Sequence, residues 1–143
     1  MIEKELIEYI IFGILAVMGF IAVWIVIERL IYYKFVRLNE FDSKELLEIA
    51  LTKNLSLLAS IAVNAPYIGL LGTVAGIMMT FIDIAADTTS IDPSVIMVGL
   101  ALALKATAFG LIVAIPSSFV YNLLVRKSDI LLTLWETREA KKD

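Results

Sequence analysis

Three long stretches of the chain carry almost no charge, and they determine the expected architecture. Residues 9–27 and 55–82 contain no charged residue, and residues 93–125 contain a single one, Lys105. A helix needs about 20 apolar residues to cross the hydrocarbon layer of a bilayer, and each stretch reaches about that length. The pattern predicts an all-α membrane protein. Its three transmembrane helices are expected near residues 9–31, 57–82 and 93–125.

The polar segments between and after these stretches are expected to be helical as well. In the connection 32–56, Asp42 stands three residues before Glu45, a spacing typical of a capping box that starts a helix. An Asp-Pro pair at Asp92 favours the start of another helix. The tail 126–143 continues the apolar periodicity of the preceding span, so we expect that helix to continue beyond the bilayer.

Lysine and arginine are distributed unevenly among the segments outside the spans. The connection between residues 28 and 54 has five and the tail after residue 125 has five, whereas the segment before residue 9 has one and the loop 83–92 has none. Basic residues concentrate on the cytoplasmic side of a membrane. The predicted topology therefore has the N-terminus and the short loop outside, and the connection and tail in the cytoplasm. We treat residues 1–143 as one membrane domain.

Small residues recur at helical spacing in the second and third predicted spans. They are Gly69, Gly72 and Gly76 in the second span, and Ala103, Gly110 and Ala114 in the third. Inside a membrane, small residues let two helix backbones approach closely, so these faces predict helix–helix packing.

One threonine lies within each of these small-residue faces, Thr73 in the second span and Thr107 in the third. The two spans are antiparallel and joined by a short loop, so the two side chains are expected at a similar depth. Two interpretations are open. Each hydroxyl donates to a carbonyl of its own helix, which is an ordinary packing arrangement, or both border a polar pathway through the membrane.

The composition argues against most enzymatic and metal chemistry. The chain has no histidine and no cysteine, which removes the commonest metal ligand, the commonest general base and the thiolate nucleophile. Phosphate-binding loops, a nucleophile elbow and a basic stripe for nucleic acid are also absent from the sequence. We expect that the protein has no enzymatic activity and binds neither a metal nor an organic cofactor. Since no Asp or Glu lies in the middle of a span, a proton pathway would need a titratable group from a second protein.

Lys105 is the one ionisable residue inside a predicted span. It lies 13 residues after Asp92, about 20 Å along the helix, which places it nearer the cytoplasmic side in this prediction. On a helical wheel it faces away from Thr107. Its charge is expected to be accommodated by snorkelling to the cytoplasmic headgroups, by an ion pair with Glu28 at the inner end of the first span, or by deprotonation.

Two sequence elements resemble a known family. NAPYIGLLGTVAGI, beginning at Asn64, and ALKATAFGLIVAIP, beginning at Ala103, are similar to the MotA/TolQ/ExbB proton channel family, and most of all to its ExbB and TolQ members. The resemblance implies a homo-oligomeric ring, a pentamer, with a central pore lined by the second and third helices. It also implies that Thr73 and Thr107 face that pore.

The same resemblance implies partners and a location. The pore of the family holds the single transmembrane helices of an ExbD-like or TolR-like protein, which carry a proton-accepting Asp. Proton flow then drives a TonB-like or TolA-like protein from the bacterial inner membrane, for outer-membrane transport or maintenance. Two departures mark this chain as a compact variant. Its N-terminus and cytoplasmic connection are short, and Leu102 stands where the family often has a Glu.

Two other functions are alternatives to this one. A flagellar stator subunit fits less well, because those family members resemble four-span chains with a large cytoplasmic domain. A non-conducting structural adaptor, which assembles another membrane complex, is the alternative from a different class. The threonine-bearing face on both spans favours the channel subunit, since an adaptor needs no such face.

Overall fold

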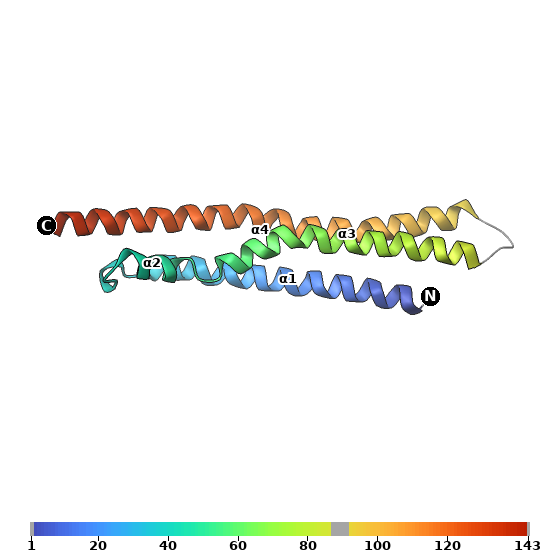
Figure 1. The fold of residues 1–143 in the computed structure, drawn as a ribbon, viewed down its shortest axis with the longest axis horizontal. Helices are drawn as coiled ribbons and strands as arrows, with labels where there is room; N and C mark the ends of the chain where they lie inside the picture. The colour runs from blue at the N-terminus through green and yellow to red at the C-terminus, as the bar shows by residue number, and fades with distance from the viewer. Residues whose placement is uncertain (1, 87–91, 143) are drawn as a thin grey trace.

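The computed structural model of the protein describes residues 2–86 and 92–142, and within these ranges the regular structure is helical. In chain order the elements are α1 (Ile2–Phe35), the short 3-10 helix η1 (Leu38–Glu40), α2 (Lys44–Leu51), α3 (Leu55–Ala86) and α4 (Pro93–Lys142). Figure 1 shows α1, α3 and α4 lying side by side along one long axis. Helix α2 lies at the C-terminal end of α1, and α4 extends past both.

The three long helices confirm the predicted all-α membrane architecture. Each of α1, α3 and α4 is long and apolar enough to cross a bilayer. In the most apolar stretch of each helix, only 22%, 17% and 22% of the residues are buried within the chain. Most of the apolar surface of each helix therefore faces away from the chain, toward lipid or other helices.

Helix α1 packs against both other long helices through a small cluster of buried apolar residues. Ile11 and Leu15 of α1 contact Ala65 of α3 and Ala106 and Ala114 of α4. Short alanine side chains let the larger residues of α1 lie in the groove between α3 and α4. This contact sets the depth of α1 relative to the other two helices.

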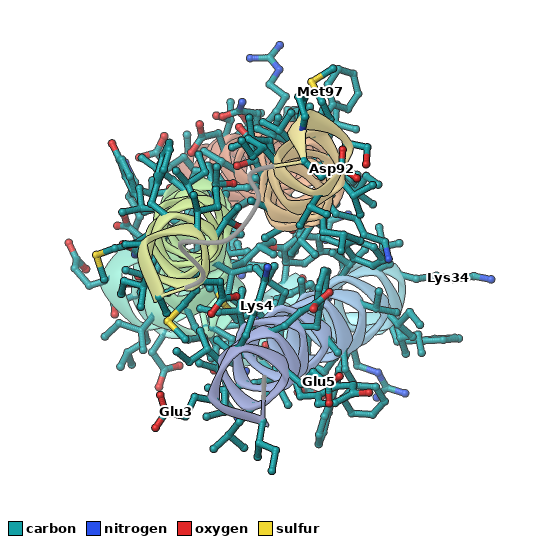
Figure 2. All side chains as sticks on the ribbon, turned by 90° about the vertical axis from the view of Figure 1, so that its right-hand side faces the viewer. Glu3, Lys4, Glu5, Lys34, Asp92 and Met97 are labelled. Atoms are coloured by element: carbon teal, nitrogen blue, oxygen red, sulfur yellow. The ribbon has the colours of Figure 1, made fainter. Side chains whose placement is uncertain are left out.

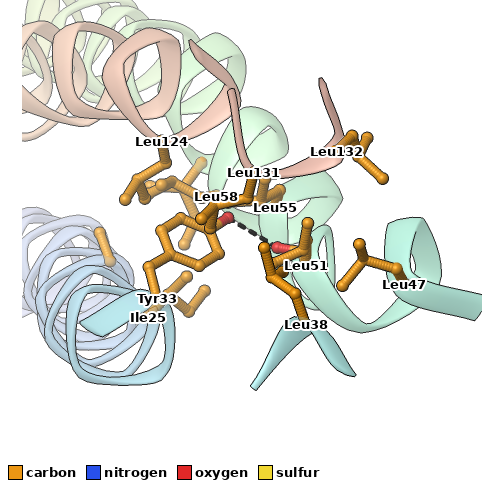
Figure 3. Packing of buried hydrophobic residues seen from close by; sticks show 12 residues of the cluster. Ile25, Tyr33, Leu38, Leu47, Leu51, Leu55, Leu58, Leu124, Leu131 and Leu132 are labelled. Atoms are coloured by element: carbon orange, nitrogen blue, oxygen red, sulfur yellow. Dashed lines mark hydrogen bonds between the residues drawn. The ribbon is translucent and has the colours of Figure 1, made fainter. Parts of the chain in front are cut away.

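A second, larger cluster joins every element at the other end of the molecule, where α1 ends and α3 begins. We call it the basal cluster (Figure 3). Its buried members are Ala22, Ile25, Tyr33, Leu38, Leu47, Leu51, Leu55, Leu58, Ile61, Leu124, Leu131 and Leu132. The Tyr33 hydroxyl donates to the carbonyl oxygen of Leu51 at 2.6 Å, and the indole N–H of Trp135 donates to the carbonyl oxygen of Phe41 at 3.2 Å.

The two predicted helix starts have different outcomes. At α4 the prediction is confirmed: the backbone N–H of Ser94 donates to the Asp92 carboxylate at 2.9 Å, and this bond holds the pKa of Asp92 below its ordinary value. At α2 the predicted cap is wrong by one residue. The Ser43 hydroxyl, and not the Asp42 carboxylate, accepts from the backbone N–H of Leu46, because Ser43 has the extended backbone that an N-cap requires.

Candidate functional site

Helices α3 and α4 meet along a face made of glycine and alanine, which we call the α3–α4 seam. Its members are Gly69, Gly72, Gly76, Ala103, Ala106 and Gly110. A Cβ atom on Gly69 would lie 2.6 Å from the carbonyl oxygen of Ala106, and one on Gly110 would lie 2.6 Å from the carbonyl oxygen of Ala65. Both distances are too short for any side chain, so these two positions require glycine. Ala114 is also buried, but it belongs to the cluster around Ile11 and Leu15.

The two threonines meet across this seam. The hydroxyl oxygens of Thr73 and Thr107 are hydrogen-bonded to each other, and the Thr73 hydroxyl also lies 2.9 Å from the carbonyl oxygen of Ala103 on α4. The carbonyl oxygen of Gly69, in the helix of Thr73 itself, is farther away at 3.3 Å. A hydroxyl donates one proton, so the arrangement that satisfies both groups has Thr107 donating to Thr73 and Thr73 donating to Ala103. The hydroxyls form a short hydrogen-bonded chain between helices.

The two hydroxyls differ in exposure. Thr73 is 7% exposed, whereas Thr107 is partly exposed at the edge of the seam. On α4, Phe109 packs edge-on against Phe12 of α1 with ring centres 4.9 Å apart. Thr107 precedes Phe109 by two residues, which is about 160° around the helix. The exposed edge of the threonine pair therefore lies on the side of the seam that faces away from α1.

Arg29 forms a buried polar network that sequence analysis did not single out. The residue is 1% exposed, and its guanidinium donates to both carboxylate oxygens of Glu28, at 2.5 and 2.6 Å. It also donates to the carbonyl oxygens of Ala50 and Leu51 at 2.6 and 3.2 Å, and lies 4.4 Å from the ring centre of Tyr32. These carbonyls belong to the last turn of α2, where no intrahelical donor is available. The available signal was the pair Glu28 and Arg29 directly after the first apolar stretch, followed closely by two tyrosines.

The predicted environment of Lys105 needs correction on two points. Within the chain, Glu28 pairs with Arg29 and not with Lys105. Lys105 also lies near the opposite end of α1 from Glu28. A Cβ on Gly72 would touch both Ile11 and Ala106, so Ala106 is level with Ile11, the third residue of the uncharged stretch of α1. The prediction assumed that the membrane begins at Asp92. In the structure, the N-terminal end of α4 extends about three turns past the level at which the uncharged stretch of α1 begins.

The N-terminal end of α1 is attached to α3 by a further polar contact. The Lys4 ammonium donates to the Thr80 hydroxyl at 3.2 Å, and Thr80 also donates to the carbonyl oxygen of Gly76 at 2.8 Å. Figure 2, which looks along the helices from this end, shows Lys4 directed into the space between the three helices and Glu3 directed away from it. A cavity of about 30 Å³, large enough for one water, lies beside Lys4 and Glu8.

The comparisons with known proteins agree with this architecture. The sequence matches the MotA/TolQ/ExbB proton channel family over residues 26–137. It is 52% identical, over 93% of this chain and 88% of the relative, to the putative biopolymer transport protein ExbB-like 2 of Helicobacter pylori. It is 53% identical, over 93% of this chain and 89% of the relative, to the biopolymer transport protein ExbB of Aquifex aeolicus.

A third relative shows how the family varies in length. The biopolymer transport protein ExbB of Salmonella typhimurium is 47% identical over 70 residues, which are 49% of this chain but only 28% of that protein. The matched segment is thus a much smaller part of that protein than of the two relatives above. With the match covering most of its helical structure, the chain belongs to the MotA/TolQ/ExbB proton channel family.

Proposed function

We propose that this chain is the channel-forming subunit of a proton-driven motor in the bacterial inner membrane. In this proposal several copies assemble into a ring, a pentamer by resemblance to the family, and α3 and α4 of each copy line its central pore. An ExbD-like or TolR-like partner places its single helices in that pore, and a TonB-like or TolA-like protein receives the energy. The names of the relatives, biopolymer transport proteins, support this role.

The hydrogen-bonded pair of Thr73 and Thr107 is the observation that carries the proposal. The pair lies inside a membrane-spanning segment, it bonds across two helices, and its exposed edge faces away from α1. A hydroxyl can accept and donate at once, so two linked hydroxyls are able to hand a proton to a group on the pore side. Packing alone does not require a hydroxyl at the edge of a seam otherwise made of glycine and alanine.

The acidic residues support the need for a partner. In the described ranges, no carboxylate of α3 or α4 lies between Leu55 and Ile82 or between Pro93 and Val125. Glu28 is held by Arg29 at the basal end. A proton acceptor at mid-membrane must therefore come from another polypeptide, which is the role that the resemblance assigns to the partner's Asp.

We propose the orientation that the lysine and arginine distribution favours, with the start of α1 in the periplasm and the end of α4 in the cytoplasm. Cysteines introduced at Thr88 and Ser43 test it with a membrane-impermeant thiol reagent in intact cells. The Thr88 variant should be labelled and the Ser43 variant should not. The reverse pattern would refute this orientation.

The function itself is tested with the complex of this chain and its single-span partner, reconstituted in liposomes with an internal pH-sensitive dye. We expect the double variant Thr73→Val, Thr107→Val to assemble normally but to lose at least about tenfold in proton flux, because valine keeps the shape and removes both hydroxyls. The matched control, Thr73→Ser with Thr107→Ser, keeps the hydroxyls and should retain most of the flux. Full flux in the valine variant would remove both threonines from the proton pathway, whereas no flux through the unmodified complex would favour the adaptor function instead.

A further inference from the structure

A hollow between α1 and α4 opens on the face of the chain opposite the threonine pair. Its volume is about 760 Å³. Apolar side chains from both helices form its walls, and three charged residues lie along it. The apolar members are Phe12, Leu15, Ala16, Gly19, Phe109, Ile112 and Val113, accompanied by Tyr9, and the charged members are Glu5, Glu8 and Lys105.

The charged residues of this hollow are ordered by depth. Lys105 adjoins Ala106, which is level with Ile11 of α1. Relative to Ile11, Glu8 lies about one helical turn nearer the start of α1, and Glu5 lies nearly two turns nearer. From the start of α1 inward, the hollow thus presents two carboxylates, then an ammonium, then an apolar groove that continues to Gly19.

Lys105 has no ion-pair partner among the residues that the structure describes. By contrast, Lys4 is bonded to Thr80, and Arg29 is bonded to Glu28. The Cα–Cβ bond of Lys105 tilts toward the start of α4, on the same side as the two carboxylates, and a lysine side chain extends readily in that direction. From this depth its ammonium extends toward Glu8, which directly precedes the uncharged stretch of α1.

We propose that this hollow binds one phosphatidylethanolamine molecule, with the phosphate at Lys105, the ethanolamine ammonium at Glu8 and Glu5, and an acyl chain along the groove toward Gly19. The order of charges in that lipid, cation outermost, then phosphate, then hydrocarbon, is complementary to the order in the hollow. Phosphatidylglycerol supplies the phosphate but no cation for the two carboxylates. Phosphatidylcholine supplies a cation without N–H donors.

A second copy of the chain is a poorer occupant for this hollow. At the depth of Lys105, the exposed residues of α3 are apolar, for example Leu70, Leu71 and Val74. They offer no anion to an ammonium group, which needs one when it leaves water. A lipid phosphate meets that need, and the proposal does not depend on the proton pathway.

The test uses native mass spectrometry of the purified full-length oligomer, incubated with phosphatidylethanolamine, phosphatidylglycerol or phosphatidylcholine of identical acyl chains. We expect phosphatidylethanolamine to be retained in preference to the other two. Lys105→Met should weaken its binding about tenfold, the effect of one lost charge-assisted contact. Glu8→Gln should reduce the preference over phosphatidylglycerol. Lys141→Met makes the same chemical change in the exposed tail of α4 and should alter nothing.

Several outcomes would overturn the proposal. These are equal retention of the three lipids by the unmodified protein, unchanged retention after Lys105→Met, or loss of the oligomer after Lys105→Met with lipid binding by the remaining chain intact. The last result would assign the hollow to a neighbouring subunit. If Lys105→Met does not fold, Glu8→Gln keeps both Lys105 and the side-chain volume and tests the same site through lipid preference alone.

Discussion

In the α3–α4 seam, the backbones of the two helices touch directly. The carbonyl oxygen of Ala106 on α4 occupies the space that a side chain at Gly69 on α3 would need. In the basal cluster, the same two helices are joined through large side chains that include Leu55 on α3 and Leu131 on α4, which are both buried and lie outside the predicted spans. The seam is thus a contact of backbones, and the basal cluster is a contact of side chains.

The surroundings of the two contacts, lipid around the seam and water around the outer part of the basal cluster, explain the difference. Within a bilayer, burying leucine gains little, because lipid tails are equally apolar, and close packing with interhelical hydrogen bonds holds helices together. Where the chain leaves the bilayer, burying a leucine gains about 1.5–3 kcal/mol. The seam should therefore be sensitive to added atoms, and the basal cluster to lost contacts.

The largest effect is expected for Arg29→Met, beside the basal cluster. The change leaves the carbonyls of Ala50 and Leu51 without their donor and Glu28 without its cation. We expect a loss of about 3 kcal/mol in the free energy of unfolding, measured by titrating the detergent-solubilised protein with a denaturing detergent. Arg37→Met, the control, alters an exposed arginine on a 3.8 Å ion pair and should have almost no effect. Equal effects of the two variants would contradict the buried network.

The next effect is expected for Gly69→Ala in the seam. The added methyl group would lie 2.6 Å from the carbonyl oxygen of Ala106, so α3 and α4 must separate. We expect a loss of about 2 kcal/mol in the same titration, a value typical of overpacking. Gly13→Ala is the matched control, since no atom lies within 4 Å of its new methyl group. If both alanine variants were equally stable, the seam would be looser than the structure shows.

A smaller effect is expected for Tyr33→Phe, which removes only the hydrogen bond to the carbonyl oxygen of Leu51. The predicted loss in the free energy of unfolding is about 1 kcal/mol. Tyr32→Phe removes a hydroxyl from the neighbouring ring, which lies against Arg29 through its face. The free energy of unfolding of that control should remain close to that of the unmodified protein. A larger loss for Tyr32→Phe than for Tyr33→Phe would count against a stabilising hydrogen bond from Tyr33 to Leu51.

The smallest effect is expected at the exposed contact between α2 and α4. The Lys44 ammonium donates to the Glu136 carboxylate at 2.5 Å, and this bond raises the pKa of Lys44. Both side chains are nevertheless in contact with water, where such pairs contribute little. Lys44→Met should not change the unfolding midpoint measurably. A clear drop would mean that α2 depends on this pair and not on the basal cluster.

Hydrophobic patterning was sufficient to predict the three membrane helices, because long uncharged stretches have few alternatives to crossing a bilayer. Family resemblance and small-residue spacing likewise indicated that Thr73 and Thr107 are associated. Patterning could not show that their hydroxyls bond across the seam, since this depends on the register of two antiparallel helices. The depth of Lys105 was misjudged for the same reason: it depends on where α1 lies along α4. The role of Arg29 was missed because two of its acceptors are the backbone carbonyl oxygens of Ala50 and Leu51, which any residue type would supply.

Helix α4 is continuous over 50 residues from Pro93 to Lys142. At about 1.5 Å per residue it is about 75 Å long, more than twice the hydrocarbon thickness of a bilayer. When such a helix tilts about a point within the membrane, the displacement of its end grows with the distance from that point. A tilt of about ten degrees at Thr107 displaces Lys142, about 52 Å away, by roughly 9 Å. A small change of tilt around Thr107 would thereby become a large displacement at the far end of the helix.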